Sequence, residues 1–178
     1  AKAQPGKIDY ASSGNGSAQH LVGALFAHMA GIKMTHVPYK GSGQALIDVM
    51  AGHVPMTFGS ITASVELLKS GRLRAVAITS EKRYPQLPGV PTFAESGYQS
   101  LVIGSWYAVW LPSKAPEAIV SKLHADIVRV LNLPEVRNRI IELGGEPVGN
   151  SPAEFDAFQK AEMARWAKVI KESGAKPE

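Results

Sequence analysis

The sequence has no cysteine and no strong excess of charge of either sign. Without cysteine, the 178-residue chain can form no disulfide, use no thiolate nucleophile and hold no Cys-ligated metal. The net charge of +4 comes from scattered Lys and Arg residues, which disfavours a nucleic-acid-binding face. No apolar run approaches the roughly 18 residues that a membrane-spanning helix needs. The 45% of hydrophobic residues is typical of a globular protein with one sizeable core or two small ones.

The first residues also lack the pattern of a signal peptide, because they have neither a charged start nor an apolar core. Residues 1–7 resemble the end of a helix, with Pro5 and Gly6 as a stop before the first predicted strand. We therefore expect the chain to be part of a longer polypeptide.

A strand, a loop rich in glycine and serine, and a helix follow one another three times. The predicted strands are 8–12, 33–38 and 54–58, and the predicted helices run to Ala30, to Gly52 and over 61–69. The carboxyl ends of parallel strands lie at one edge of a sheet, so the loops 12–17, 39–43 and 59–62 are predicted to converge on one crevice. The pattern predicts an α/β fold, with a fully buried fourth strand at 73–79.

The second half of the sequence predicts a change of architecture. Three prolines in 81–91 exclude regular structure there, and Thr92 and Glu95 have the spacing of a capping box at the start of a short helix. The aromatic segment 101–111 is predicted to be a strand, broken near Gly104, that crosses between two parts of the molecule. Three further helices are predicted at 116–131, at 134–143 and from Pro152 to near Gly174.

The loop after the first strand carries more hydrogen-bond donors than a turn requires. Its polar residues are Ser12, Ser13, Asn15 and Ser17, and it leads into a helix whose dipole favours an anion. It is neither a P-loop nor a dinucleotide-binding motif, because no Gly-Lys-Ser/Thr ending is present and Gln19 replaces the third glycine after Gly14-x-Gly16. Two interpretations remain open: an anion site, or a tight turn with Ser17 as a helix N-cap.

Three side chains near the predicted crevice also have two interpretations each. His20 faces the crevice from the first helical turn, or is a surface or half-buried histidine with a satisfied hydrogen bond. Lys40 offers a positive charge to a carboxylate, or is an ordinary solvated lysine. Trp106 lines the cleft, or belongs to the core. The histidines do not have the spacing of metal ligands, so we predict neither a metal nor a cofactor.

The predicted crevice has no evident catalytic base. None of the three loops contains Asp or Glu, and the chain has no Gly-x-Ser-x-Gly nucleophile elbow. Binding without turnover is therefore the favoured hypothesis. The alternative is an α/β enzyme that uses the same anion hole for a phosphorylated or acyl substrate.

Several motifs along the whole chain occur together in one known family. They are Tyr10-Ala-Ser-Ser-Gly-Asn-Gly-Ser-x-x-His20, His36-Val-Pro-Tyr-Lys-Gly41, Leu73-Arg-Ala-Val-Ala-Ile-Thr79, Lys82-Arg83, Leu87-Pro-Gly-Val-Pro-Thr92, Ser105-Trp106, Gly145-x-Pro-Val-Gly149 and Trp166-Ala-Lys-Val169. In this order they closely resemble the Bug proteins, the TctC-like solute receptors of tripartite tricarboxylate transporters.

The resemblance implies a periplasmic binding protein of the type II-like, two-lobed kind. Such a receptor closes like a flytrap on a small mono-, di- or tricarboxylate and presents it to membrane permease subunits. The chain resembles the C-terminal three-fifths of the family: residues 1–104 would form the second lobe, and residues 105–178 the C-terminal part of the first lobe. Without the N-terminal half of that lobe, apolar helix faces would be exposed. The chain would then form a dimer or a domain swap, or be a remnant unable to bind.

The resemblance also implies a set of ligand-binding residues. A carboxylate would be held by Ser12, Ser13, Gly14, Asn15, Gly16, Ser17 and His20, with Tyr39, Lys40, Gly59, Ser60 and Trp106 shaping or charging the wall. The family often has Asp where this chain has Gly59, and a loop without that Asp is less suited to an amino group.

Overall fold

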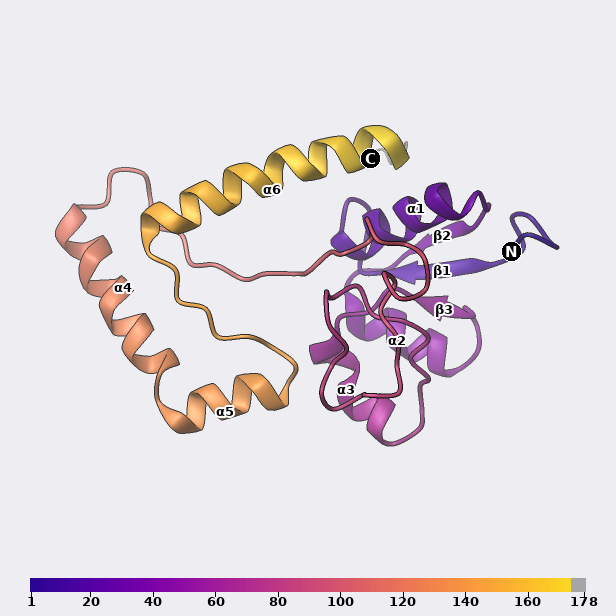
Figure 1. Ribbon diagram of the computed structural model, residues 1–178, viewed down its shortest axis with the longest axis horizontal. Coiled ribbons are helices and arrows are strands. Elements are labelled where there is room, and N and C mark those ends of the chain that lie inside the picture. Colours follow the sequence, from indigo (N-terminus) through magenta and orange to yellow (C-terminus); the bar gives the residue numbers. More distant parts are fainter. Residues whose placement is uncertain (174–178) are drawn as a thin grey trace. The chain divides into compact units, whose positions relative to one another are not determined.

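The computed structural model describes residues 1–173, and contacts between residues divide the chain into two units (Figure 1). The first unit is Ala1–Ser105 together with Trp166–Glu178, of which the structure describes the part up to Ser173, and the second is Trp106–Arg165. The contacts place the end of the chain with the first unit, whereas the predicted lobes divide the sequence once, between 104 and 105. The assignment of the residues to lobes of a receptor stays a prediction.

The first unit is built on a three-stranded parallel sheet with β1 at its centre (Figure 1). The strands, in spatial order, are β2 (Thr35–Pro38), β1 (Asp9–Ser12) and β3 (Met56–Thr57). The helices that follow β1, β2 and β3 are α1 (Ala18–Ala30), α2 (Ser42–Met50) and α3 (Ile61–Lys69). The three predicted strand–loop–helix repeats are therefore confirmed, with the third strand shorter than expected.

Helix α1 begins and ends where its sequence signals predict. The Ser17 hydroxyl accepts a hydrogen bond from the backbone N–H of His20, which satisfies one of the unpaired donors at the helix start. Gly31 follows the helix with φ of 60°, in the left-handed region that glycine adopts without strain.

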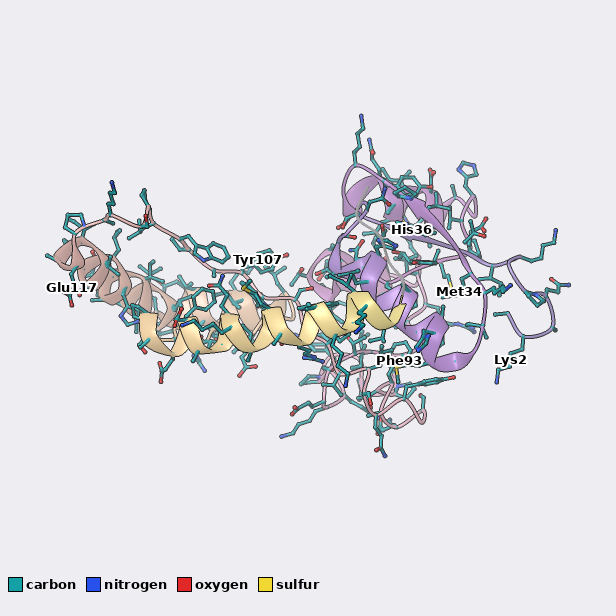
Figure 2. All side chains as sticks on the ribbon, turned by 90° about the horizontal axis from the view of Figure 1, so that it is seen from above. Lys2, Met34, His36, Phe93, Tyr107 and Glu117 are labelled. Carbon is teal, nitrogen blue, oxygen red and sulfur yellow. The ribbon has the colours of Figure 1, made fainter. Side chains whose placement is uncertain are left out.

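The two faces of β1 carry different neighbours, because successive side chains point to opposite sides of a strand. Tyr10 lies against α1, where its hydroxyl donates to the backbone oxygen of His20. Ala11 packs on the other face in a cluster with Ala45 of α2 and Val54. His36 of β2 (labelled in Figure 2) is the register partner of Tyr10, and the rings of the two residues are in contact.

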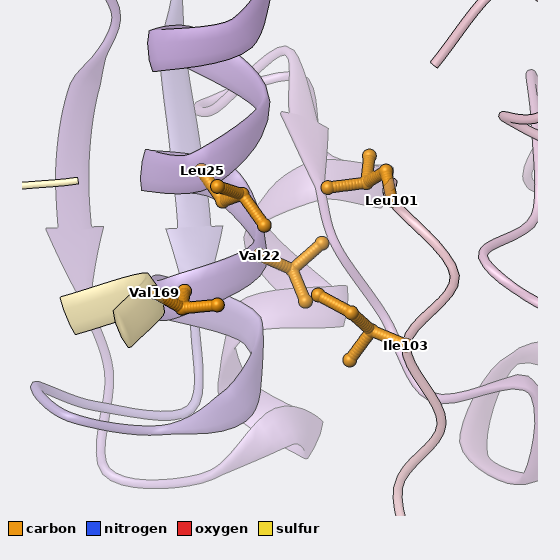
Figure 3. Close-up of a cluster of buried hydrophobic side chains, with 5 residues drawn as sticks. All are labelled: Val22, Leu25, Leu101, Ile103 and Val169. Carbon is orange, nitrogen blue, oxygen red and sulfur yellow. The ribbon is translucent and has the colours of Figure 1, made fainter. Parts of the chain in front are cut away.

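The largest apolar cluster of the first unit joins segments that are far apart in the sequence (Figure 3). Val22 and Leu25 of α1 contact Leu101 and Ile103 from the long irregular segment and Val169 from α6. Partly buried aromatic rings surround them: Phe26, Phe58, Phe93, Tyr98 and Trp166. The end of α6 is thus part of the core of the first unit.

Two predicted strands are not strands in the structure. In the described part of the chain, the segment 73–79, expected to be fully buried, forms a single bridge between Ile78 and Thr92, and Val76 is 74% exposed. Among the described residues, 101–111 has no ladder partner. Ile103 instead exchanges two isolated hydrogen bonds with Thr79. A strand needs a continuous partner as well as an apolar sequence, and neither segment has one within residues 1–173.

The predicted short helix after Thr92 is also absent, although its capping box forms. The Thr92 N–H donates to the Glu95 carboxylate at 2.7 Å, and the Glu95 N–H donates to the Thr92 hydroxyl at 3.0 Å. The chain that follows is a turn rather than a helix. Gly97 lies in the left-handed region, so the backbone reverses before a helix can propagate.

The second unit contains helices but no sheet among its described residues. They are α4 (Glu117–Leu131), α5 (Pro134–Glu142) and the first part of α6 (Pro152–Ser173). Helix α6 begins as predicted, and Ser151 and Glu154 form a capping box at its start. The predicted end near Gly174 lies outside the described residues. No side chain of α4 or α5 is buried within the described part of the chain. None of the described helices is both long and apolar enough to cross a membrane.

Replacing Gly23 by alanine tests the packing between α1 and β1. A Cβ at Gly23 would lie 2.7 Å from the Cζ atom of the Tyr10 ring, and that ring is buried and cannot move aside. We expect Gly23→Ala to lower the free energy of unfolding by about 1–3 kcal/mol, measured by urea denaturation.

Gly43→Ala is the matched control, because Gly43 is exposed in α2 with no atom within 4 Å of an added Cβ. We expect this change to raise the free energy of unfolding by about 0.5–1 kcal/mol. Equal effects of the two variants would contradict the close approach of α1 to β1.

Candidate anion-binding site

The loops that follow β1 and β2 meet at the carboxyl edge of the sheet. The backbone N–H of Tyr39 donates to the backbone carbonyl oxygen of Ser12 at 3.0 Å, and the Gln19 side chain donates to the Ser42 hydroxyl at 3.3 Å. A Cβ on Gly14 would lie 3.3 Å from the backbone carbonyl oxygen of Tyr39, so the first loop passes close to the second. The structure therefore brings together two of the three loops that the sequence predicts to converge.

The backbone donors of the first loop are bonded to side chains of the same segment. The N–H of Ser13 donates to Gln19 Oε1 at 2.7 Å, and the N–H of Gly14 donates to Ser12 Oγ at 3.1 Å. The N–H of Gly16 donates to His20 Nδ1 at 3.1 Å. These three donors therefore do not point together at an empty position. The loop is instead held in one shape by its own acceptors.

The hydroxyl groups of this loop differ in what they can offer. Ser12 is fully buried, and its Oγ lies 2.6 Å from His36 Nε2, so its hydroxyl is hydrogen-bonded inside the protein. The Ser17 hydroxyl accepts from the N–H of His20 and keeps its own proton for another acceptor. Ser13 is partly exposed, and Asn15 is exposed at the tip of the loop. The outward-facing polar groups are therefore those of Ser13, Asn15 and Ser17.

Two histidine rings are stacked behind the loop. The rings of His20 and His36 have centroids 3.9 Å apart and planes within 5° of parallel. Burial lowers the pKa of His20, and burial together with the neighbouring His20 lowers the pKa of His36 to about 4. Both rings are therefore neutral near pH 7, and His20 Nδ1 keeps the lone pair that accepts from Gly16.

The hydroxyl proton of Tyr39, in the second loop, is used in a hydrogen bond to a carboxylate. Its hydroxyl donates to Asp48 Oδ2 at 2.7 Å, and this hydrogen bond lowers the pKa of Asp48 and raises that of Tyr39. The phenolic oxygen can then only accept from a ligand. A carboxylate with a lowered pKa is also a poor base at neutral pH. Lys40 is exposed, and among the described residues its side chain forms no ion pair or hydrogen bond.

The third loop is short and tightly packed. The Ser60 hydroxyl is 2.7 Å from that of Thr62 at the start of α3. A Cβ on Gly59 would lie 3.1 Å from the hydroxyl of Ser64, which is itself buried. Glycine at position 59 is therefore favoured by the packing beneath the loop, and an aspartate there would need Ser64 to shift.

Trp106 belongs to the second unit, where it is part of an aromatic cluster. Its ring centroid lies 5.6 Å from those of Phe155 and Phe158 and 6.0 Å from that of Trp110. Its role at a ligand site stays a prediction. No three His, Asp or Glu side chains in the described part of the chain are grouped so as to hold a metal.

Sequence reasoning missed three residues that shape this site: Gln19, His36 and Asp48. Gln19 departs from a glycine motif, His36 lies within the second predicted strand, and Asp48 lies inside the helix that follows it. Each acts on a loop through a side chain from a neighbouring element, which no local sequence signal records.

Acid is expected to destabilise the first unit through His36. The pKa of a histidine in the unfolded chain is about 6.5, so neutral His36 makes its full contribution to the free energy of unfolding above that pH. It is lost progressively as the pH falls toward the folded value of about 4. We expect a His36→Gln variant to lose less unfolding free energy than the wild type between about pH 7.5 and about pH 5, measured by urea denaturation. The exposed His28, changed to glutamine, is the control; equal losses in all three proteins would contradict this prediction.

Comparisons with known proteins agree on one family. The model of the tripartite tricarboxylate transporter family receptor, TctC, matches residues 1–175. A UPF0065 protein from the tcbD-tcbE intergenic region of Pseudomonas sp. strain P51 is 38% identical over 97% of this chain and 52% of its own length. Protein BugT of Bordetella pertussis is 37% identical over 98% of this chain and 54% of its own length. The chain thus spans about half the length of these curated relatives.

Solved structures with the same fold include proteins with bound carboxylates. R. palustris Rpa4515 with adipate has a TM-score of 0.94 and 38% identity, over 100% of this chain and 60% of that one. The periplasmic binding protein BugD has a TM-score of 0.90 and 32% identity, over 99% and 60%. MatC from Rhodopseudomonas palustris with bound malate has a TM-score of 0.84 and 30% identity, over 93% and 57%.

Proposed function

Because the chain belongs to the tripartite tricarboxylate transporter receptor family, we propose that it forms part of a solute-binding protein that captures a small carboxylate for such a transporter. The observation that carries the proposal is the match of the entire chain to a structure with adipate, at a TM-score of 0.94. Malate in a second neighbour supports the same ligand class, because both compounds are dicarboxylates. The proposal includes a periplasmic location and delivery to membrane permease subunits.

The polar groups of the first loop support binding of one carboxylate. Ser13, Asn15 and Ser17 face outward, while Gly14 and Gly16 let the backbone turn between them. Lys40 in the adjacent loop adds a positive charge, which a carboxylate needs when it leaves water. The remaining predicted residues are proposed to support this group or to form the wall: Ser12, His20, Tyr39, Gly59, Ser60 and Trp106.

The proposal is binding without turnover, with no metal or cofactor. Asp48 is ionised and bonded to Tyr39 of the second loop, so it is poorly placed to accept a proton from a substrate. The enzyme alternative would need another base. Hydrolysis or transfer of a phosphorylated or acyl substrate by the purified protein would favour that alternative.

Lys40→Ala tests the proposed site in the complete encoded polypeptide. With adipate and malate as ligands in a calorimeter, we expect the affinity to fall about tenfold, as the loss of a hydrogen bond to a charged group predicts. Lys33→Ala is the control, since it removes the same charge from the exposed region before β2, at the opposite edge of the sheet. Equal affinities of the two variants would remove Lys40 from the site, and no heat with either ligand would count against the function.

We also propose that the 178-residue chain, expressed alone, associates with a second copy through its second unit. That unit leaves many large apolar side chains exposed, among them Tyr107, Val109, Trp110, Ile119 and Val130. Contiguous apolar surface favours association. Light scattering should give a mass above the 19.0 kDa of one chain. A monomer at all accessible concentrations would contradict this proposal.

A further inference from the structure

His20 is almost completely enclosed by the surrounding protein, and both its ring and its backbone make contacts there. It is only 9% exposed, and its ring is stacked on that of His36. Its backbone N–H donates to Ser17, and its backbone oxygen accepts from Tyr10. Its Nδ1 accepts from the N–H of Gly16. A side chain in this setting lies behind the loop rather than in front of it.

The bond to Gly16 requires a particular form of His20. An Nδ1 atom that accepts an N–H must be unprotonated, so the ring is neutral with its proton on Nε2. The groups that contact the two stacked rings are Tyr10 and Ser12 from β1 and the N–H of Gly16 from the loop. None of these three is charged near neutral pH, since burial raises the pKa of Tyr10 to about 12. The surroundings therefore favour the neutral ring.

The loop needs such support because its backbone is intrinsically mobile. Gly14 and Gly16 have φ values of 134° and 72°, and glycine in such a loop has many other conformations available. Holding the bound shape before the ligand arrives reduces the entropy lost on binding. A hydrogen bond from Gly16 to a buried, stacked ring fixes the middle of the loop, between the outward-facing Asn15 and Ser17.

We propose that His20 is a positioning residue: its neutral Nδ1 holds the N–H of Gly16 and so sets the shape of the loop that receives the carboxylate. The proposal rests on the proposed function and makes His20 act through the loop. It differs from the family-based expectation that His20 itself holds the ligand. In that case a ring N–H would donate to the carboxylate, and the nitrogen involved would have to be Nε2, because Nδ1 is occupied.

Two substitutions separate these roles, because each places an amide group where one of the two imidazole nitrogens lies. In His20→Asn the amide oxygen takes the place of Nδ1, whereas in His20→Gln the amide reaches the place of Nε2. We expect His20→Asn to bind adipate or malate within about threefold of the wild type, and His20→Gln and His20→Ala to bind about tenfold more weakly, measured by calorimetry on the complete encoded polypeptide. His28→Asn, in the same helix at an exposed position, is the control.

A second measurement does not need a ligand. The Gly16 amide proton should be protected from exchange in the wild type and in His20→Asn, and unprotected in His20→Gln, as observed by NMR. Acidification through the pKa of His20 should remove the protection in the wild type but not in His20→Asn. The comparison of the wild type with His20→Asn still applies if His20→Gln fails to fold.

The outcomes are distinct. Wild-type binding by His20→Gln together with weak binding by His20→Asn would overturn the proposal in favour of direct contact. Unprotected Gly16 in the wild type would overturn it whatever the affinities. If the wild type binds no carboxylate, the proposed function fails, and the Gly16 amide alone then decides whether His20 holds the loop.

Discussion

The structure of the first unit depends on the burial of β1 between two parallel neighbours. Pairing on both sides fixes the register of this strand, and the alternation of its side chains then determines what each face can pack. Tyr10 occupies the face toward α1, where Gly23 allows its ring to approach the helix closely. Ser12 follows on the same face, at the point where the strand ends and the loop begins. The position of the loop is thus set by the packing of Tyr10, two residues earlier.

This arrangement explains how a loop of small residues keeps one shape. A glycine- and serine-rich segment has little side-chain volume with which to pack, so hydrogen bonds must restrain it. Gln19 and His20, from the first turn of α1, bond the N–H groups of Ser13 and Gly16. Helix α1 therefore does more than end the loop with a partial positive charge. It supplies the acceptors that fix the backbone and leave the side chains of Ser13, Asn15 and Ser17 facing outward.

The sequence predicts the parts of this fold that depend on local signals. The N-cap Ser17, the left-handed Gly31 and the capping box of Ser151 and Glu154 are interactions between residues a few positions apart, and all are present. The predicted strand at 73–79 is wrong, because its apolar sequence indicates burial but carries no information on a pairing partner. For the same reason, the serines of the first loop could be recognised as polar and clustered, whereas the hydrogen bond of Ser12 to His36 could not.

The charges of the three loops limit what they can bind by themselves. Lys40 is the one residue in 12–17, 39–43 and 59–62 that is charged near neutral pH, so these loops offer one positive charge together with neutral donors. A carboxylate that leaves water needs compensation from charge or from several hydrogen bonds. In the proposed function, one carboxylate obtains this from the first two loops. The second carboxylate of a dicarboxylate is separated from the first by its carbon chain, so it needs donors from outside these loops. The loops of the first unit would then set the affinity for one end of the ligand, and residues beyond them would select its length.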